Sequence, residues 1–165
     1  MKTFQRRKFK DEHGVEFSAC GDSAVLTRMP KDFIGAYRVP DFVSSIGLCA
    51  INGCNGLTSL VIPKSVTVIE KDNFELCEQL ASLVVEQGNP MFDSRENCNA
   101  IIVTATDTLV HGCNSSSIPD SIERIESTAF DRCNRIERVF IPKGTTDYFM
   151  RFDALKQYRH RFMEL

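Results

Sequence analysis

The sequence lacks the features that mark several large functional classes. No segment approaches the roughly 20 consecutive apolar residues that a membrane-spanning helix needs. The 20 basic and 22 acidic residues leave a net charge of −2, so no overall field favours nucleic acid or an anionic membrane. The nine glycines are scattered and form no phosphate-binding loop. These absences argue against membrane insertion, nucleic-acid binding and nucleotide binding by a standard motif.

An export signal is also missing from the sequence as given. The first ten residues, MKTFQRRKFK, are basic, but the charged segment DEHGVEFS follows them where a signal peptide has its apolar region. The sequence therefore predicts a cytoplasmic protein, and the alternative is a secreted or cell-surface protein whose leader was removed. We interpret the basic run Arg6-Arg7-Lys8 as a solvated tail.

What the sequence does contain is a repeat. Its apolar residues recur at fixed offsets from three prolines, and the first two prolines are one 23-residue period apart. The positions are Val43, Ile46, Ile51, Cys54, Leu57 and Leu60 after Pro40; Val66, Ile69, Phe74, Cys77, Leu80 and Leu83 after Pro63; and Ile122, Ile125, Phe130, Cys133, Ile136 and Val139 after Pro119. Such a period predicts a solenoid in which stacked coils share one core.

Each repeat divides into three pieces. Residues 57–62 alternate and favour β-structure, which predicts a strand with Leu60 and Ile62 pointing inward. Pro63 ends this strand because proline cannot donate to a strand ladder. Residues 66–69 predict a second, shorter strand, and 71–77 a single helical turn.

One unit is longer than the others. Residues 84–118 add ten residues to the period, and 100–104 and 108–111 in them predict a hairpin. We expect a single domain over 1–165. It has an amino-terminal cap hairpin at 1–33, repeats at 34–142 that include this longer unit, and a cap at 143–165. In the last cap, 145–152 and 153–161 carry helical apolar stripes, and 162–165 alternate like a last short strand.

The cysteines fit this repeat. An odd total of seven argues against a fully paired extracellular framework. Cys54, Cys77 and Cys133 share one repeat position, where a small buried hydrophobe is expected. We therefore interpret these three cysteines as core residues.

The segment IPDSIERIESTAFDRCNRIERVFIP, at 118–142, resembles the BspA-type leucine-rich repeats of bacteria. Their units read IP-x-S-V-x-x-I-x-x-x-A-F-x-x-C-x-x-L, and the unit at 61–83 differs in having Asn73 where alanine is preferred. The resemblance implies a right-handed α/β solenoid with a parallel concave β-sheet, short convex strands, single helical turns and a helical carboxy-terminal cap. It also implies protein binding or host-surface adhesion, usually by a secreted or surface protein, without enzymatic activity.

The repeat also predicts a candidate binding face. If Leu60 and Ile62 point inward, then Ser59 and Val61 point outward on the concave sheet. Residues one repeat before or after them are expected to point outward from the neighbouring coils. The candidate partner-binding residues are Arg38, Ser59, Val61, Ser82, Val84, Arg138 and Phe140. Arginine and aromatic residues are common at binding hot spots, so we expect a protein partner on this mixed apolar and basic strip.

The sequence gives less support to a catalytic or metal-binding site than to a protein-binding face. Cys98, Cys113 and His111 lie in the longer unit, but nothing around them resembles a nucleophile motif. A zinc site from the same three residues lacks a fourth ligand and a C-x-x-C pair. We therefore expect a non-enzymatic protein-binding module without metal or cofactor, and favour a monomer. The alternatives are a structural or self-associating repeat protein and, remotely, a cysteine-dependent hydrolase.

Overall fold

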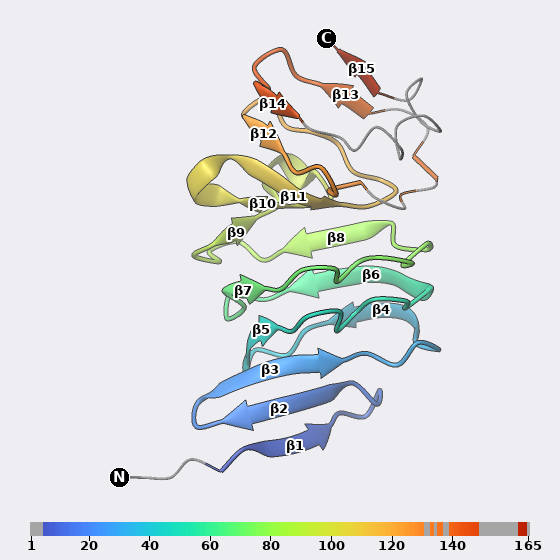
Figure 1. Ribbon diagram of the computed structural model, residues 1–165, viewed down its shortest axis with the longest axis vertical. Helices are drawn as coiled ribbons and strands as arrows, with labels where there is room; N and C mark the ends of the chain where they lie inside the picture. The colour runs from blue at the N-terminus through green and yellow to red at the C-terminus, as the bar shows by residue number, and fades with distance from the viewer. Residues whose placement is uncertain (1–4, 131–132, 134, 137–138, 149–161, 165) are drawn as a thin grey trace.

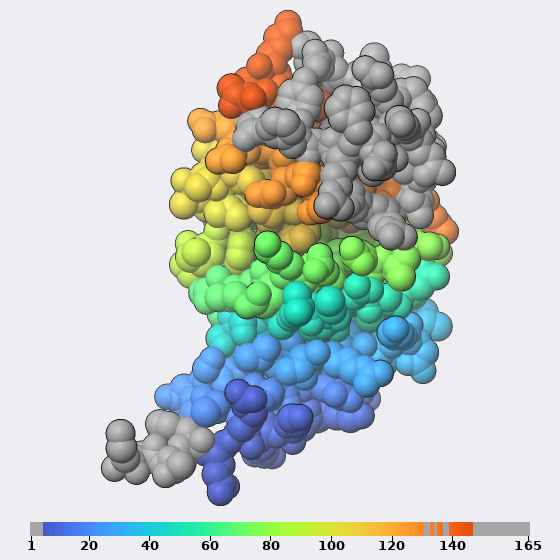
Figure 2. All heavy atoms as spheres, viewed as in Figure 1, coloured from blue at the N-terminus to red at the C-terminus, as the bar shows by residue number. Residues whose placement is uncertain are grey.

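The chain forms a stack of short β-strands that runs from β1 near the amino terminus to β15 near the carboxy terminus (Figure 1). The computed structural model describes residues 5–130, 133, 135–136, 139–148 and 162–164. In a space-filling view, successive coils appear as bands of colour, so each coil packs mainly on its neighbours (Figure 2). This is the arrangement that a 23-residue repeat predicts.

The strands fall into four sheets. The first sheet has the order β1-β2-β3-β5-β7, with β1 at Arg7–Lys10, β2 at Glu16–Cys20, β3 at Ser23–Arg28, β5 at Val43–Ile46 and β7 at Val68–Ile69. The second, which we call the long-strand sheet, has the order β4-β6-β8, with β4 at Ile34–Arg38, β6 at Gly56–Ile62 and β8 at Ser82–Val85. Both β4-β6-β8 and β3-β5-β7 pair in parallel, whereas β1, β2 and β3 pair antiparallel.

The other two sheets lie beyond β8. One has the order β14-β12-β11-β10-β9, with β9 at Phe92–Asp93, β10 at Ala100–Val103, β11 at Thr108–Gly112, β12 at Arg124–Ile125 and β14 at Asp147–Tyr148. The other pairs β13 at Val139–Ile141 with β15 at Phe162–Glu164. In the longer unit, β10 and β11 form an antiparallel hairpin.

One turn is repeated at four corners of the stack, each of which has a proline. The backbone N–H three residues after the corner proline donates to the carbonyl of that proline. The bonds are Val43 to Pro40 (3.0 Å), Val66 to Pro63 (3.3 Å), Ile122 to Pro119 (3.0 Å) and Thr145 to Pro142 (3.0 Å). Because proline has no N–H to donate, it ends the strand while its carbonyl closes the turn.

The core follows the inward positions of the repeat. Leu60, Ile62 and Leu83 are fully buried, as the alternation predicts. The buried side chains form two clusters, one from the amino-terminal cap to the longer unit and one from the longer unit to β13. The long unit therefore lies where the two parts of the core meet.

The structure explains why Asn73 stands where the repeat prefers alanine. It is fully buried, its Oδ1 accepts from the Ile51 N–H at 3.1 Å, and its Nδ2 donates to the carbonyls of Gly47 and Glu70. A buried polar side chain is stable only when it is hydrogen-bonded. The amide of Asn73 therefore links its own coil to the backbone of the preceding one.

The helical predictions were wrong where the structure tests them. Residues 71–77 form bends and turns, because Asp72 (φ 58°) and Leu76 (φ 59°) are left-handed and interrupt any helix. Asp147–Tyr148 is a strand that pairs in parallel with β12, so the repeat continues into the predicted helical cap. The rest of that prediction, 149–161, lies outside the described residues. Within the described residues, the helices are two short 3-10 turns, Arg95–Asn97 and Thr104–Thr106; no described helix is long and apolar enough to cross a bilayer.

The basic run Arg6-Arg7-Lys8 is exposed, as a solvated run requires, but most of it is not a tail. Arg7 and Lys8 belong to β1, which pairs antiparallel with β2. Phe9 anchors the strand, because its ring lies 5.3 Å from that of Phe17 and 5.7 Å from that of Phe42. Aromatic packing of this kind holds a strand that its charges alone would leave in solvent.

Candidate functional site

The outer face of the long-strand sheet brings five of the predicted residues together. The pairing places Ala36, Ser59 and Ser82 in one row across β4, β6 and β8. Arg38, Val61 and Val84 form the next row. Because neighbouring strands lie about 4.8 Å apart, the two rows make a continuous patch of small, apolar and basic side chains.

The charge of this patch is compensated within the chain. The Arg38 guanidinium donates from Nε to Glu86 Oε1 at 2.9 Å and from one terminal nitrogen to Asp41 Oδ1 at 2.7 Å. Glu86 directly follows β8, so the Arg38 side chain reaches past β6 to the third strand. The predicted strip therefore presents an ion-paired arginine beside Val84, which is 36% exposed.

The two remaining predicted residues do not join this patch. Phe140 is 45% exposed but lies on β13, in a different sheet from Val84. Arg138 lies outside the described residues. Residues 113–117, which the repeat would place between β8 and β13, form no strand and include three consecutive serines. The longer unit therefore interrupts the face that the repeat predicted as continuous.

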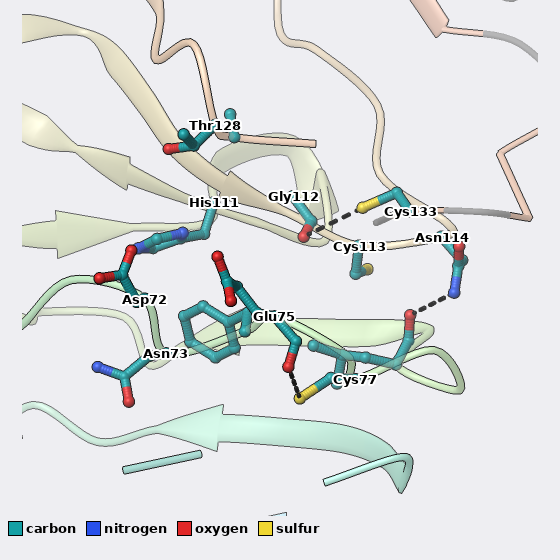
Figure 3. Close-up of a pocket in the computed structure, with 13 residues that line it drawn as sticks. Asp72, Asn73, Glu75, Cys77, His111, Gly112, Cys113, Asn114, Thr128 and Cys133 are labelled. Carbon is teal, nitrogen blue, oxygen red and sulfur yellow. Dashed lines mark hydrogen bonds between the residues drawn. The ribbon is translucent and has the colours of Figure 1, made fainter. Parts of the chain in front are cut away.

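A small cavity of about 50 Å³ lies where the end of the longer unit meets the coils before and after it. Figure 3 shows its lining, with Asp72 and Glu75 from one coil facing His111 from β11. The His111 ring packs on Phe74, with ring centroids 4.7 Å apart and an interplanar angle of 63°. Burial lowers the pKa of His111 to about 4, while the nearby Asp72 carboxylate opposes this shift. The cavity thus holds a neutral imidazole at physiological pH.

The cysteines of this region are placed for packing. Cys98 and Cys113 are buried, and their thiols donate to the backbone carbonyls of Ala100 (3.8 Å) and Asn99 (3.2 Å). Burial raises the pKa of both thiols, which suppresses the thiolate that a nucleophile needs. Among the described residues, no group of three or more His, Cys, Asp or Glu side chains is arranged to hold a metal ion.

The repeat cysteines behave in the same way. The thiols of Cys54, Cys77 and Cys133 donate to backbone carbonyls of the preceding coil: Pro30, Ile51 and Gly112. Burial raises the pKa of the Cys54 thiol to about 12 and that of Cys77 to about 11. Cys54 and Cys77 are buried, whereas Cys133 is only partly so.

One charged cluster could not be found from the sequence. Arg95 donates to Asp93 Oδ1 (2.8 Å), Asp93 Oδ2 (2.7 Å) and Asp107 Oδ1 (2.5 Å), and Asp93 also accepts from Thr104 (2.8 Å). Asp93 and Asp107 are 14 positions apart but meet because the β10–β11 hairpin folds back on β9. The cluster joins β9 to both ends of the hairpin turn, so the carboxylates are engaged in holding the longer unit together.

The His111 environment predicts a pH-dependent stability. Because the folded pKa lies below the ordinary value of 6.5, the stabilisation is complete above pH 6.5 and is lost as the pH falls towards 4. We expect the free energy of unfolding to fall by about 2 kcal/mol between pH 7 and pH 4.5 from this residue. Urea unfolding at the two pH values measures the change.

The matched variant for this test is His111→Phe, which retains a ring on Phe74 but has no titrating group. Its loss of stability between pH 7 and pH 4.5 should be smaller than that of the unmodified chain, since it lacks the imidazole whose pKa is lowered by burial. Equal losses in the two proteins would show that His111 is not the source.

Comparisons with known proteins agree with this architecture. The family model described as BspA type Leucine rich repeat region (6 copies) matches residues 34–111 and 111–151. A search of the curated proteins returned no match. The family match begins at Ile34, the first residue of β4, so it starts with the first strand of the long-strand sheet and excludes β1, β2 and β3.

Solved structures of bacterial proteins share the fold. A leucine rich cell surface protein from Faecalibacterium prausnitzii is 27% identical, with a TM-score of 0.55 over 84% of this chain and 34% of its own. A leucine-rich repeat protein from Eubacterium ventriosum is 18% identical, with a TM-score of 0.58 over 69% of this chain and 31% of its own. The pneumococcal vaccine antigen PcpA is 18% identical, with a TM-score of 0.54 over 73% of this chain and 37% of its own.

This chain therefore spans about a third of the length of each of these structures. The family match extends over more than half of the chain and includes its corner prolines, its repeat cysteines and its stacked parallel strands β4, β6 and β8. The protein belongs to the BspA-type leucine-rich repeat family.

Proposed function

We propose that this chain is a non-enzymatic protein-binding module that uses the outer face of the long-strand sheet. The observation that carries the proposal is the register of β4, β6 and β8, which aligns Ala36–Ser59–Ser82 beside Arg38–Val61–Val84. Small side chains allow a partner to approach the sheet closely, and Val61 and Val84 offer apolar area to bury. Repeats of this family typically act as protein-interaction or adhesion modules, which supports the same function.

The chemistry of the chain supports binding over catalysis. The thiols of the longer unit are buried and their pKa values are raised, which disfavours a cysteine-dependent hydrolase. The similar protein from Faecalibacterium prausnitzii is a cell surface protein, which favours the secreted or surface location over the cytoplasmic one. The partner is then a protein met at that surface, and adhesion is the finer function that we propose.

A matched pair of valines tests which face binds. Val84 is 36% exposed on β8, and Val68 is 46% exposed on β7, in a different sheet. We expect Val84→Glu to abolish retention of a partner from host-cell or bacterial extracts, because it buries a charge at the interface. Val68→Glu should retain the partner. Quantitative mass spectrometry of the captured proteins measures both.

Two results would contradict this proposal. Retention by Val84→Glu, or its loss only in Val68→Glu, would assign binding to another face. Because both valines are partly exposed, each variant should unfold within about 1 kcal/mol of the unmodified chain, and thermal unfolding checks this. If the unmodified chain captures no protein and light scattering shows a mass that rises with concentration, self-association is the function instead.

A further inference from the structure

The amino-terminal cap carries a basic groove that lies outside the proposed binding face. It has a volume of about 610 Å³ and is lined by strands β1, β2 and β3 and the residue before them. Its charged lining consists of Arg6, Lys8, Lys10 and Arg28 against the single carboxylate of Glu16. A chain with a net charge of −2 therefore presents a locally positive surface at one end.

Most of this positive charge is unpaired. Lys10 pairs with Glu16 at 3.1 Å, and the pairing of strands places Glu16 between Lys10 and Arg28. In the described part of the chain, Arg6, Lys8 and Arg28 make no ion pair. Glu16 also lies in the field of Arg28 and Lys8, but it is a single carboxylate among four cations, so the groove has capacity for further carboxylates.

The same strand has an open backbone edge. β1 is the end strand of the first sheet, and among the described strands it pairs only with β2. The outward N–H and C=O groups of an end strand can pair with a further extended segment. A basic groove beside an open edge favours a ligand that is both acidic and extended.

The reverse side of β1 has a different chemistry. Phe9 alternates with Lys8 and Lys10, so its side chain lies on the opposite face of the strand. Phe9 packs with Phe17 and Phe42, and the residue Phe42 is 49% exposed. A strand laid along β1 therefore meets lysine on one face and, on the other, an aromatic cluster in which the Arg7 guanidinium lies 5.6 Å from the centre of the Phe9 ring.

We propose that β1 accepts an extended acidic segment of a partner protein as an additional β-strand. The segment alternates acidic with apolar residues, because side chains in a strand point to opposite faces at a period of two. Its carboxylates face Lys8 and the groove, and its apolar side chains cover Phe9 and Phe42. A sulfated glycan or nucleic acid would satisfy the cations but would use neither the backbone edge nor the aromatic rings.

A synthetic peptide tests this directly. The probe is a fluorescein-labelled peptide that alternates glutamate with valine, titrated with the intact chain and followed by fluorescence anisotropy. We expect saturable binding that weakens with salt, and no binding of a peptide that alternates lysine with valine. Lys8→Glu should raise the Kd about tenfold, since it reverses a charge in the groove. Lys64→Glu is the matched control, because Lys64 is an exposed lysine of another coil and should leave the Kd unchanged.

Two N-methylated forms of the peptide test strand addition. Alternate N–H groups of a strand point to opposite edges, so only one set can pair with β1. Methylation of the glutamate nitrogens and methylation of the valine nitrogens should therefore differ, with only one of the two abolishing binding. Arg28→Glu provides a second groove variant, and thermal unfolding shows whether each variant is folded.

Three results would overturn the proposal. Equal binding of the two methylated peptides would show attraction to charge without strand pairing. Heparin or an oligonucleotide that binds in a Lys8-dependent way, while the peptide does not, would assign the groove to another polyanion. Absence of all binding would mean that the cations only shield the edge of β1 from aggregation. None of these results bears on the long-strand sheet, so this proposal and the proposed function fail separately.

Discussion

Replacing Gly56 with alanine is expected to lower the free energy of unfolding by at least about 2 kcal/mol. A Cβ atom at Gly56 would lie 2.5 Å from the backbone oxygen of Phe33 and 3.2 Å from the Cα of Ile34. These are backbone atoms of the preceding coil, so they cannot move aside as a side-chain tip can. Relief requires β4 and β6 to separate where they pair. Urea unfolding followed by circular dichroism measures the effect.

Gly144→Ala is the control for this prediction. The nearest heavy atom to a Cβ at Gly144 is the backbone oxygen of Asp120 at 4.0 Å, which is ordinary contact distance. Alanine there should change the free energy of unfolding by less than about 1 kcal/mol. If the two substitutions had equal effects, the close approach of β4 to β6 would not be the reason for Gly56.

The second large effect is expected from Asn89→Val. Asn89 occupies the repeat position of Val43 and Val66, so a consensus argument would call this change stabilising. The structure predicts the reverse. The Asn89 amide donates to the carbonyls of Pro63 (3.0 Å) and Val66 (2.7 Å) and accepts from the N–H groups of Met91 and Phe92, both at 2.9 Å.

Valine at this site would remove the partners of the Val66 carbonyl and of the Met91 and Phe92 N–H groups, whereas the Pro63 carbonyl would keep its bond from the Val66 N–H. Each such group costs about 1–3 kcal/mol, and the gain from burying the valine side chain offsets about 1.5–3 kcal/mol of the total. We expect a net loss of about 3 kcal/mol, measured as a lower urea midpoint. Asn55→Val, at an exposed asparagine, should change stability by less than about 0.5 kcal/mol. A stabilised Asn89→Val protein would contradict this account.

Much of the architecture could be predicted because the same pattern of apolar, proline and turn residues recurs in each coil. The corner prolines, the buried Leu60 and Ile62, and the β10–β11 hairpin all follow from local alternation and turn chemistry. The outward rows on β4, β6 and β8 follow because equivalent residues of successive coils lie side by side. Repetition thus converts a weak local signal into a three-dimensional position.

Three structural features were not predicted correctly from the sequence, each for a physical reason. A helical turn at 71–77 was predicted from composition, but the left-handed conformations of Asp72 and Leu76 have no clear signature in the sequence. The strand β1 was not predicted, because its charged residues surround the one side chain that packs on the core, Phe9. The strand at 147–148 was hidden by apolar residues that also fit a helical period, although it lies 23 residues after β12.

The sequence by itself determined the period, the family and the side of each strand that faces the core, because these depend on spacing along one chain. Only the tertiary structure decided which charges are available. Arg38 is paired with Glu86, 48 positions away, and Arg95 with Asp107, whereas Lys8 and Arg28 face an open groove. The tertiary structure also divided the predicted face, since Val84 and Phe140 lie in separate sheets. Ion pairs and sheet boundaries depend on the distances between residues of different coils. Where the longer unit breaks the period, the repeat no longer predicts these distances.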